Sequence, residues 1–188
     1  MNLALLMQNA HPHRVDGNDP RLLTEDDRIV HALRNTPTLP NEDRAQSVEL
    51  VTKLMLETSS NKVRNAAAIF LTDVLGKAAA ENIVRVLKRP GLAKAAGSLL
   101  FSLNDVEARL PLDLILDMIE QGSLEAQGEA LTFLEDCRVD PFDAEQFAVA
   151  KARLSACLNN PASPAVAHAA EIALEYLNGL TPEAGQMS

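Results

Sequence analysis

Carboxylate side chains at helical spacing are the most informative chemical feature of this sequence. Between Asp105 and Glu145 the chain has twelve acidic and two basic residues, a net charge of −10. Two predicted helices in this block each carry three carboxylates on one face: Asp113, Asp117 and Glu120 on the first, and Glu125, Glu129 and Asp136 on the second. Like charges at i, i+4 repel by about 0.2–0.5 kcal/mol. We therefore predict that this acidic face binds a positively charged partner.

The same carboxylates allow two other interpretations. An ordinary solvated helix face would have the same composition. A cation site would need more, because helical carboxylates without a turn-rich coordinating loop seldom bind Ca²⁺ or Mg²⁺. We predict no metal site.

Basic residues are concentrated upstream of the acidic block. Between Asn61 and Lys94 there are seven basic and two acidic residues, a net charge of +5. A stripe of Arg85, Lys88 and Arg89 could contact phosphates, but it is short and has no aromatic residues for base stacking. Pairing of Glu81 with Arg85 explains part of it. With a net charge of −9 for the whole chain, nucleic-acid binding is the least favoured function.

An alternative partner-binding set combines basic residues with polar positions on the predicted inner helices. It comprises Arg64, Arg85, Lys88, Arg89, Lys94 and Gln127. This set would serve a partner that enters a groove between helices, and we expect such binding to be insensitive to salt.

The histidines and cysteines form no catalytic pattern. His168 and Cys157 could be imagined as base and nucleophile, but no oxyanion-hole loop or orienting group is evident around them. Without secretory context, Cys137 and Cys157 are expected to be free thiols. We predict no enzymatic activity and no cofactor.

Composition favours a helical protein. The chain has 188 residues, 47% of them hydrophobic but only 3% aromatic, and alanine and leucine dominate. This profile suits helix-on-helix packing better than a sheet. No apolar stretch approaches the roughly 20 residues that cross a bilayer. The short run Leu3–Met7 lacks the features of a signal peptide, so we expect a cytoplasmic protein.

One nine-residue pattern recurs along the chain. Val63–Leu71 reads VRNAAAIFL, and similar segments begin at Ala93, Ala126 and Val166, at offsets of 30, 33 and 40 residues. A small residue occupies the same place in each copy: Ala67, Gly97, Ala130 and Ala170. Helical hairpins repeated at this spacing are typical of stacked arrays, in which small side chains let adjacent helices approach. A plain globular bundle of alanine-rich helices is the alternative.

Helix boundaries follow from caps and breakers. Thr24 and Asn41 are expected to cap two N-terminal helices. The remaining predicted helices cover residues 61–75, 78–89, 92–103, 107–121, 123–137, 143–158 and 164–177. We predict an N-terminal arm over 1–20, one all-α domain over 21–180 that forms a short α-solenoid, and a polar tail over 181–188.

Residues 61–178 resemble the HEAT-repeat family, especially its short variants. Val63–Ala67 is similar to the family's V-R-x-A-A, and Ala93–Gly97 echoes it. The third copy departs, with Gln127 and Glu129 where arginine and alanine are usual, and the family's proline survives only as Pro164. The resemblance implies a superhelix of about four hairpins that is used for protein binding.

Together these features predict a stoichiometric protein-binding solenoid that acts through its acidic surface. The sharpest form of this hypothesis is an immunity protein, or antitoxin, that neutralises a cationic toxin such as a nuclease. The alternative is an adaptor or assembly-factor subunit that binds a peptide or helix in the solenoid groove. A DNA-binding HEAT-like protein is a third and weaker hypothesis.

Overall fold

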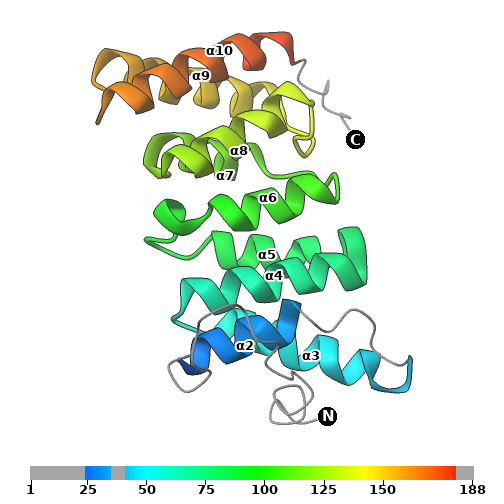
Figure 1. The fold of residues 1–188 in the computed structure, drawn as a ribbon. Coiled ribbons are helices and arrows are strands. Elements are labelled where there is room, and N and C mark those ends of the chain that lie inside the picture. The colour runs from blue at the N-terminus through cyan, green and yellow to red at the C-terminus, as the bar shows by residue number, and fades with distance from the viewer. Residues whose placement is uncertain (1–23, 35–40, 181–188) are drawn as a thin grey trace. The chain divides into compact units, whose positions relative to one another are not determined.

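All regular structure in the described part of the chain is helical, apart from one isolated bridge between Leu110 and Val139. The computed structural model describes residues 24–34 and 41–180, so the predicted arm over 1–20 and tail over 181–188 lie outside it. The chain divides into two compact units, Met1–Asn82 and Ile83–Ser188 (Figure 1). The predicted all-α class is confirmed, and the single domain over 21–180 stays a prediction.

In the first unit, α4 (Asn61–Leu75) packs against both α2 (Glu25–Arg34) and α3 (Asn41–Glu57). The predicted cap at Thr24 is confirmed, because its hydroxyl accepts a hydrogen bond from the Asp27 N–H at 3.2 Å. The Asp27 carboxylate accepts from the Thr24 hydroxyl at 2.7 Å, which lowers the pKa of Asp27. The buried apolar side chains of these helices include Ile29, Leu33, Val51, Met55, Val63 and Leu71.

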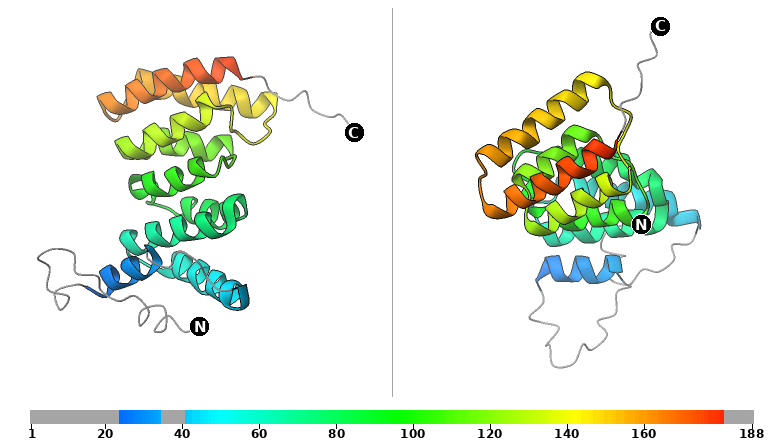
Figure 2. Two further views of the ribbon diagram at one scale, coloured as in Figure 1. Left: turned by 45° about the vertical axis from the view of Figure 1, so that its right-hand side comes forward. Right: turned by 90° about the horizontal axis from the view of Figure 1, so that it is seen from above.

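The second unit arranges its helices in two layers, which the two views of Figure 2 show from different sides. The helix α8 (Leu124–Glu135) contacts α6 (Gly97–Asp105) and α10 (Pro164–Gly179), so these three form one layer. The other layer is formed by α7 (Leu112–Gln121) and α9 (Ala144–Asn159), which contact each other. The pairs α7–α8 and α9–α10 also pack together, and this joins the layers.

Local capping explains where most of these helices begin. Ser123 accepts a hydrogen bond from the Ala126 N–H, which confirms the predicted cap of α8. Asp143 and Gln146 form a reciprocal capping box at α9, and Ser163 caps α10 with Pro164 in its first turn. The helix α4 has the predicted bounds and ends at Gly76, whose φ of 57° is a left-handed value.

Three helices begin two or more residues later than predicted, and α8 ends at Glu135 instead of residue 137. The segment predicted over 78–89 is a 3-10 turn, Gly76–Ala79, followed by α5 (Ala80–Leu87). The segment predicted from Leu92 has a 3-10 turn at Ala93–Ala95, and α6 begins only at Gly97. The helix predicted from Glu107 begins at Leu112, because Glu107 has left-handed backbone and Pro111 disfavours helical backbone at Leu110.

The column of small residues is buried, as predicted. Ala67 lies in the first unit, and Gly97, Ala130 and Ala170 lie in the second. A Cβ at Gly97 would lie less than 3.0 Å from the outer atoms of the Glu125 side chain, which is exposed and flexible and would have to turn aside.

Candidate partner-binding groove

Two loops of the same geometry follow α6 and α8. Glu107 and Cys137 both have left-handed backbone, with φ of 52° and 54°. In each loop the next residue donates its N–H to a carbonyl five residues back, from Ala108 to Leu103 at 3.0 Å and from Arg138 to Phe133 at 2.8 Å. These equivalent helix ends are 30 residues apart, a repeat in the loops that the sequence analysis missed.

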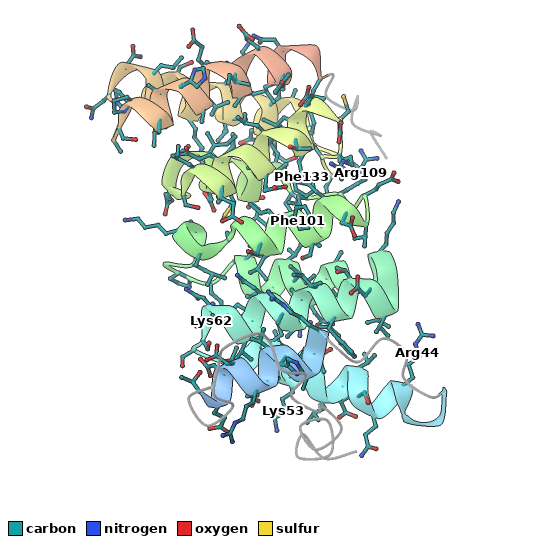
Figure 3. All side chains as sticks on the ribbon, in the orientation of Figure 1. Arg44, Lys53, Lys62, Phe101, Arg109 and Phe133 are labelled. Atoms are coloured by element: carbon teal, nitrogen blue, oxygen red, sulfur yellow. The ribbon has the colours of Figure 1, made fainter. Side chains whose placement is uncertain are left out.

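The two loops pair with each other through their backbones. The Leu110 N–H donates to the Arg138 carbonyl at 3.1 Å, and the Asp140 N–H donates to the Leu110 carbonyl at 2.8 Å. Arg109, labelled in Figure 3, adds hydrogen bonds of 2.9 and 2.6 Å from Nε and Nη2 to the Val139 carbonyl. This pairing places Pro141 and Phe142 beside the start of α7.

A groove lies between α7, the loop at residues 140–142 and α9. Its volume is about 410 Å³. The apolar lining comprises Pro111, Leu112, Leu116, Pro141, Phe142, Val149 and Ala150. Val149 is 52% exposed, although it is a large apolar residue in a helix. The Phe142 ring stacks on Phe147 of α9, with ring centroids 6.1 Å apart, and this fixes one wall.

The charged rim of the groove is mainly negative. Asp113 on α7, Asp140 in the loop and Glu145 on α9 are the acidic lining residues, and Arg153 is the basic one. Arg153 is already engaged, because its Nε and Nη2 donate to the two Glu120 oxygens at 2.9 and 2.8 Å. Its Nη2 also donates to Asp117 at 2.7 Å. These hydrogen bonds raise the pKa of Arg153 above its ordinary value, so its charge is permanent and locally neutralised.

The structure separates the first predicted acidic trio into two kinds of carboxylate. Asp113 is exposed at the groove. Asp117 and Glu120 instead bind Arg153, which the sequence analysis did not single out. Arg153 is 36 residues from Asp117 and 33 from Glu120, and no spacing rule connects side chains on different helices at that distance.

The second predicted trio lies on and just after α8, in the other layer. Glu129 accepts a 2.6 Å hydrogen bond from the Asn104 amide, and Asp136 forms an ion pair with Arg138 at 2.7 Å. Arg138 also donates to the Asn104 side-chain and backbone oxygens at 2.8 and 3.0 Å, and its guanidinium lies 5.0 Å from the centroid of the Phe133 ring. Glu125 is exposed. The six acidic residues therefore form two surfaces, one on each layer.

The alternative set of basic and polar residues is divided by burial. Arg64 and Gln127 are buried, with 6% and 4% of their surface exposed. Arg64 donates a hydrogen bond to the Thr58 carbonyl at 2.9 Å, and Gln127 donates one to the Ile119 carbonyl at 3.0 Å. Each of these carbonyls precedes the helix that carries the donor. Both side chains therefore stabilise the turn that precedes their helix. Arg85, Lys88 and Lys94 are exposed and Arg89 is half-buried. Their role in partner binding stays a prediction.

The chemistry of the cysteines gives no support to a nucleophile. Cys137 and Cys157 are both free thiols in the described structure. Burial, and then the charge of Glu120, raise the pKa of Cys157, which is opposite to the shift that activates a cysteine. Within residues 24–34 and 41–180, no group of three or more histidine, cysteine or carboxylate side chains is placed to hold a metal ion. None of the helices described there is long and apolar enough to span a membrane.

Comparisons with known proteins give no relative for this chain: no family model matches the sequence, and no curated protein or solved structure matches it.

Proposed function

We propose that this chain is a stoichiometric protein-binding protein whose groove between α7 and α9 receives a cationic segment of another protein. Occlusion of that segment is the proposed activity, as when an antitoxin covers the substrate site of a basic toxin. The observation that carries the proposal is the combination of an apolar floor, with Val149 exposed, and three carboxylates at its rim.

This combination matches the chemistry of lysine and arginine. Their aliphatic stems pack on apolar surface while the charged ends stay at a polar edge. Asp113, Asp140 and Glu145 would meet such ends, and the pairing of Arg153 with Asp117 and Glu120 reduces its repulsion of an incoming cation. The same carboxylates repel phosphates, which makes nucleic acid a poor occupant.

A short α-solenoid is the architecture that we propose for this function. It is supported by the alternation of successive helices between two layers in the second unit and by the loop geometry that recurs after 30 residues. Each α7–α8 or α9–α10 pair would be one hairpin of a HEAT-like array.

The adaptor hypothesis has less support. It assigned binding to inner-helix positions that include Arg64 and Gln127, and both side chains are buried and hydrogen-bonded to carbonyls of their own chain. Substituting them would destabilise the fold before it revealed a binding role.

The test is affinity purification of partners by the wild type and by two charge-reversal variants. The groove variant carries Asp113→Lys and Glu145→Lys. The control carries Glu171→Lys and Glu175→Lys on α10, where both residues are exposed, and has the same change in net charge. We expect the wild type and the control to retain one basic protein at a 1:1 ratio and the groove variant to lose it.

Salt dependence of the purified complex completes this test. An acidic groove that steers a cationic partner predicts an association rate that falls steeply between low and physiological salt. Equal loss of the partner in both charge-reversal variants would contradict the assignment to the groove.

A further inference from the structure

A second surface of the second unit exposes large apolar side chains. We call it the α6–α8 face and define it by Phe101 on α6 and Leu124, Glu125, Gly128 and Glu129 on α8. Phe101 is 55% exposed and Leu124 is 75% exposed. Figure 3 labels Phe101 on α6. Large apolar side chains this exposed, on two helices that pack together, indicate a contact surface more strongly than a single one does.

Gly128 is the most unusual residue of this face. It lies near the middle of α8, it is exposed, and a Cβ built on it would have no atom within 4 Å. Its backbone is not left-handed. The fold therefore does not require glycine here, although alanine would favour the helix. Glycine in such a position leaves bare backbone that another chain can approach closely.

Carboxylates border this bare backbone. The Ser98 hydroxyl lies 3.5 Å from the Glu125 carboxylate, and the Asn104 amide donates to Glu129 at 2.6 Å. Phe101 lies between Ser98 and Asn104 along α6, so the two contacts to carboxylates bracket it in the sequence of that helix. An occupant must therefore be apolar at its centre and cationic at its edges.

We propose that the α6–α8 face is a docking site for a cationic amphipathic helix of another protein. The helix would cross α8 at Gly128, place its apolar side chains between Phe101 and Leu124, and direct lysine or arginine to Glu125 and Glu129. Helix axes approach most closely where small residues meet, which is the geometry that Gly128 permits. This site is on the opposite layer from the groove and does not depend on the function proposed for it.

The test is selection from a phage library of helix-stabilised 16-residue peptides against the immobilised full-length protein. We expect the enriched peptides to be cationic and amphipathic. Their affinity should fall about tenfold with Phe101→Ser, as for a central interface residue. Gly128→Ala should also weaken binding by about tenfold while it raises Tm by about 2 °C, because alanine favours the helix but fills the contact.

The matched control is Asp113→Lys, which alters the groove and leaves the α6–α8 face unchanged. Peptides that bind Phe101→Ser and Gly128→Ala as tightly as the wild type would overturn the proposal. So would peptides that lose affinity only for Asp113→Lys, because they would occupy the groove. A selection that enriches no peptide would also overturn it. Failure of this proposal and failure of the groove are distinguishable, because Phe101 and Gly128 are not among the residues changed in the groove variant.

Discussion

The helices α7 and α8 each contribute three carboxylates that look equivalent in the sequence, yet the structure uses them differently. On α7, Asp117 and Glu120 bind Arg153 of α9, and Asp113 faces a groove of about 410 Å³. On and after α8, Glu129 and Asp136 join a cluster with Asn104 and Arg138 that ties α8 to the end of α6. The ion pairs on α7 connect α7 to α9 and border the groove. The contacts of Glu129 and Asp136 stabilise the loop that follows α8.

This difference shows that net charge alone does not locate a binding surface. Arg153 neutralises two carboxylates of its own chain, Asp117 and Glu120. Arg138 pairs with Asp136 alone, and Glu129 accepts its hydrogen bond from the neutral Asn104 amide. The carboxylates without an arginine partner are Asp113 with its neighbours at the groove, and Glu125 and Glu129 on the α6–α8 face. Substituting Arg138 or Arg153 should therefore change the stability of the fold without removing the carboxylates proposed to bind a partner.

The largest effect is expected for Arg138→Met. The Arg138 side chain is 14% exposed, and its loss leaves the Asn104 oxygens without these donors and removes the contact with the Phe133 ring. We expect a loss of about 2–4 kcal/mol in the free energy of unfolding. Urea unfolding followed by circular dichroism measures it. The control is Arg109→Met, an exposed arginine of the preceding loop, and a loss as large there would mean that Arg138 has no special role.

A smaller effect is expected for Arg153→Met. This change leaves Asp117 and Glu120 to repel each other, and we expect a loss of about 1–2 kcal/mol that shrinks as salt is added, because the pair is partly exposed. Lys151→Met is a matched control on the same helix, since it removes one positive charge that lies over Phe147 and contacts neither carboxylate. Equal losses in the two variants would show that the ion pairs with Asp117 and Glu120 contribute nothing.

The two kinds of carboxylate can also be compared directly. Glu129→Ala removes the acceptor of the Asn104 amide and should cost about 1 kcal/mol. Asp113→Ala should change stability by less than about 0.5 kcal/mol, because the side chain is exposed at the groove. A chemical denaturation series on both variants checks this, and a larger loss at Asp113 would indicate a structural role that its position does not suggest.

The smallest effect is expected for the pKa of Cys157, which responds to the charges of Glu120 and Arg153. Its pKa is raised by burial and then by Glu120, so its thiolate forms at higher pH than that of free cysteine. Because the folded pKa lies above the unfolded one, the contribution of this thiol to stability is fully present below the unfolded pKa and is lost as pH rises from there through the folded pKa. The pH profile of iodoacetamide labelling in a Cys137→Ser background measures this pKa. Glu120→Gln should move the profile to lower pH, and Arg153→Met should move it to higher pH.

Several elements were predictable because they depend on short-range chemistry. Ser123 and Thr24 cap their helices as the sequence indicates, and α4 has the expected bounds. Prediction was wrong where the chain lacks a side-chain cap, as before α6, or where proline disfavours helix at the residue before it, as at Pro111. The groove could not be predicted, because it requires the loop at residues 140–142 to lie beside α7.

By itself, the sequence determined the all-α class, the buried column of small residues and the segregation of charge, since these depend on periodicity and composition. The tertiary structure decided which carboxylates face outward. Arg153 reaches Asp117 and Glu120 across 36 and 33 residues, and Arg138 reaches Asn104 across 34. The physical reason is that a carboxylate binds whichever cation the packing of the helices brings within hydrogen-bonding distance, and helical spacing within one segment carries no information about the next.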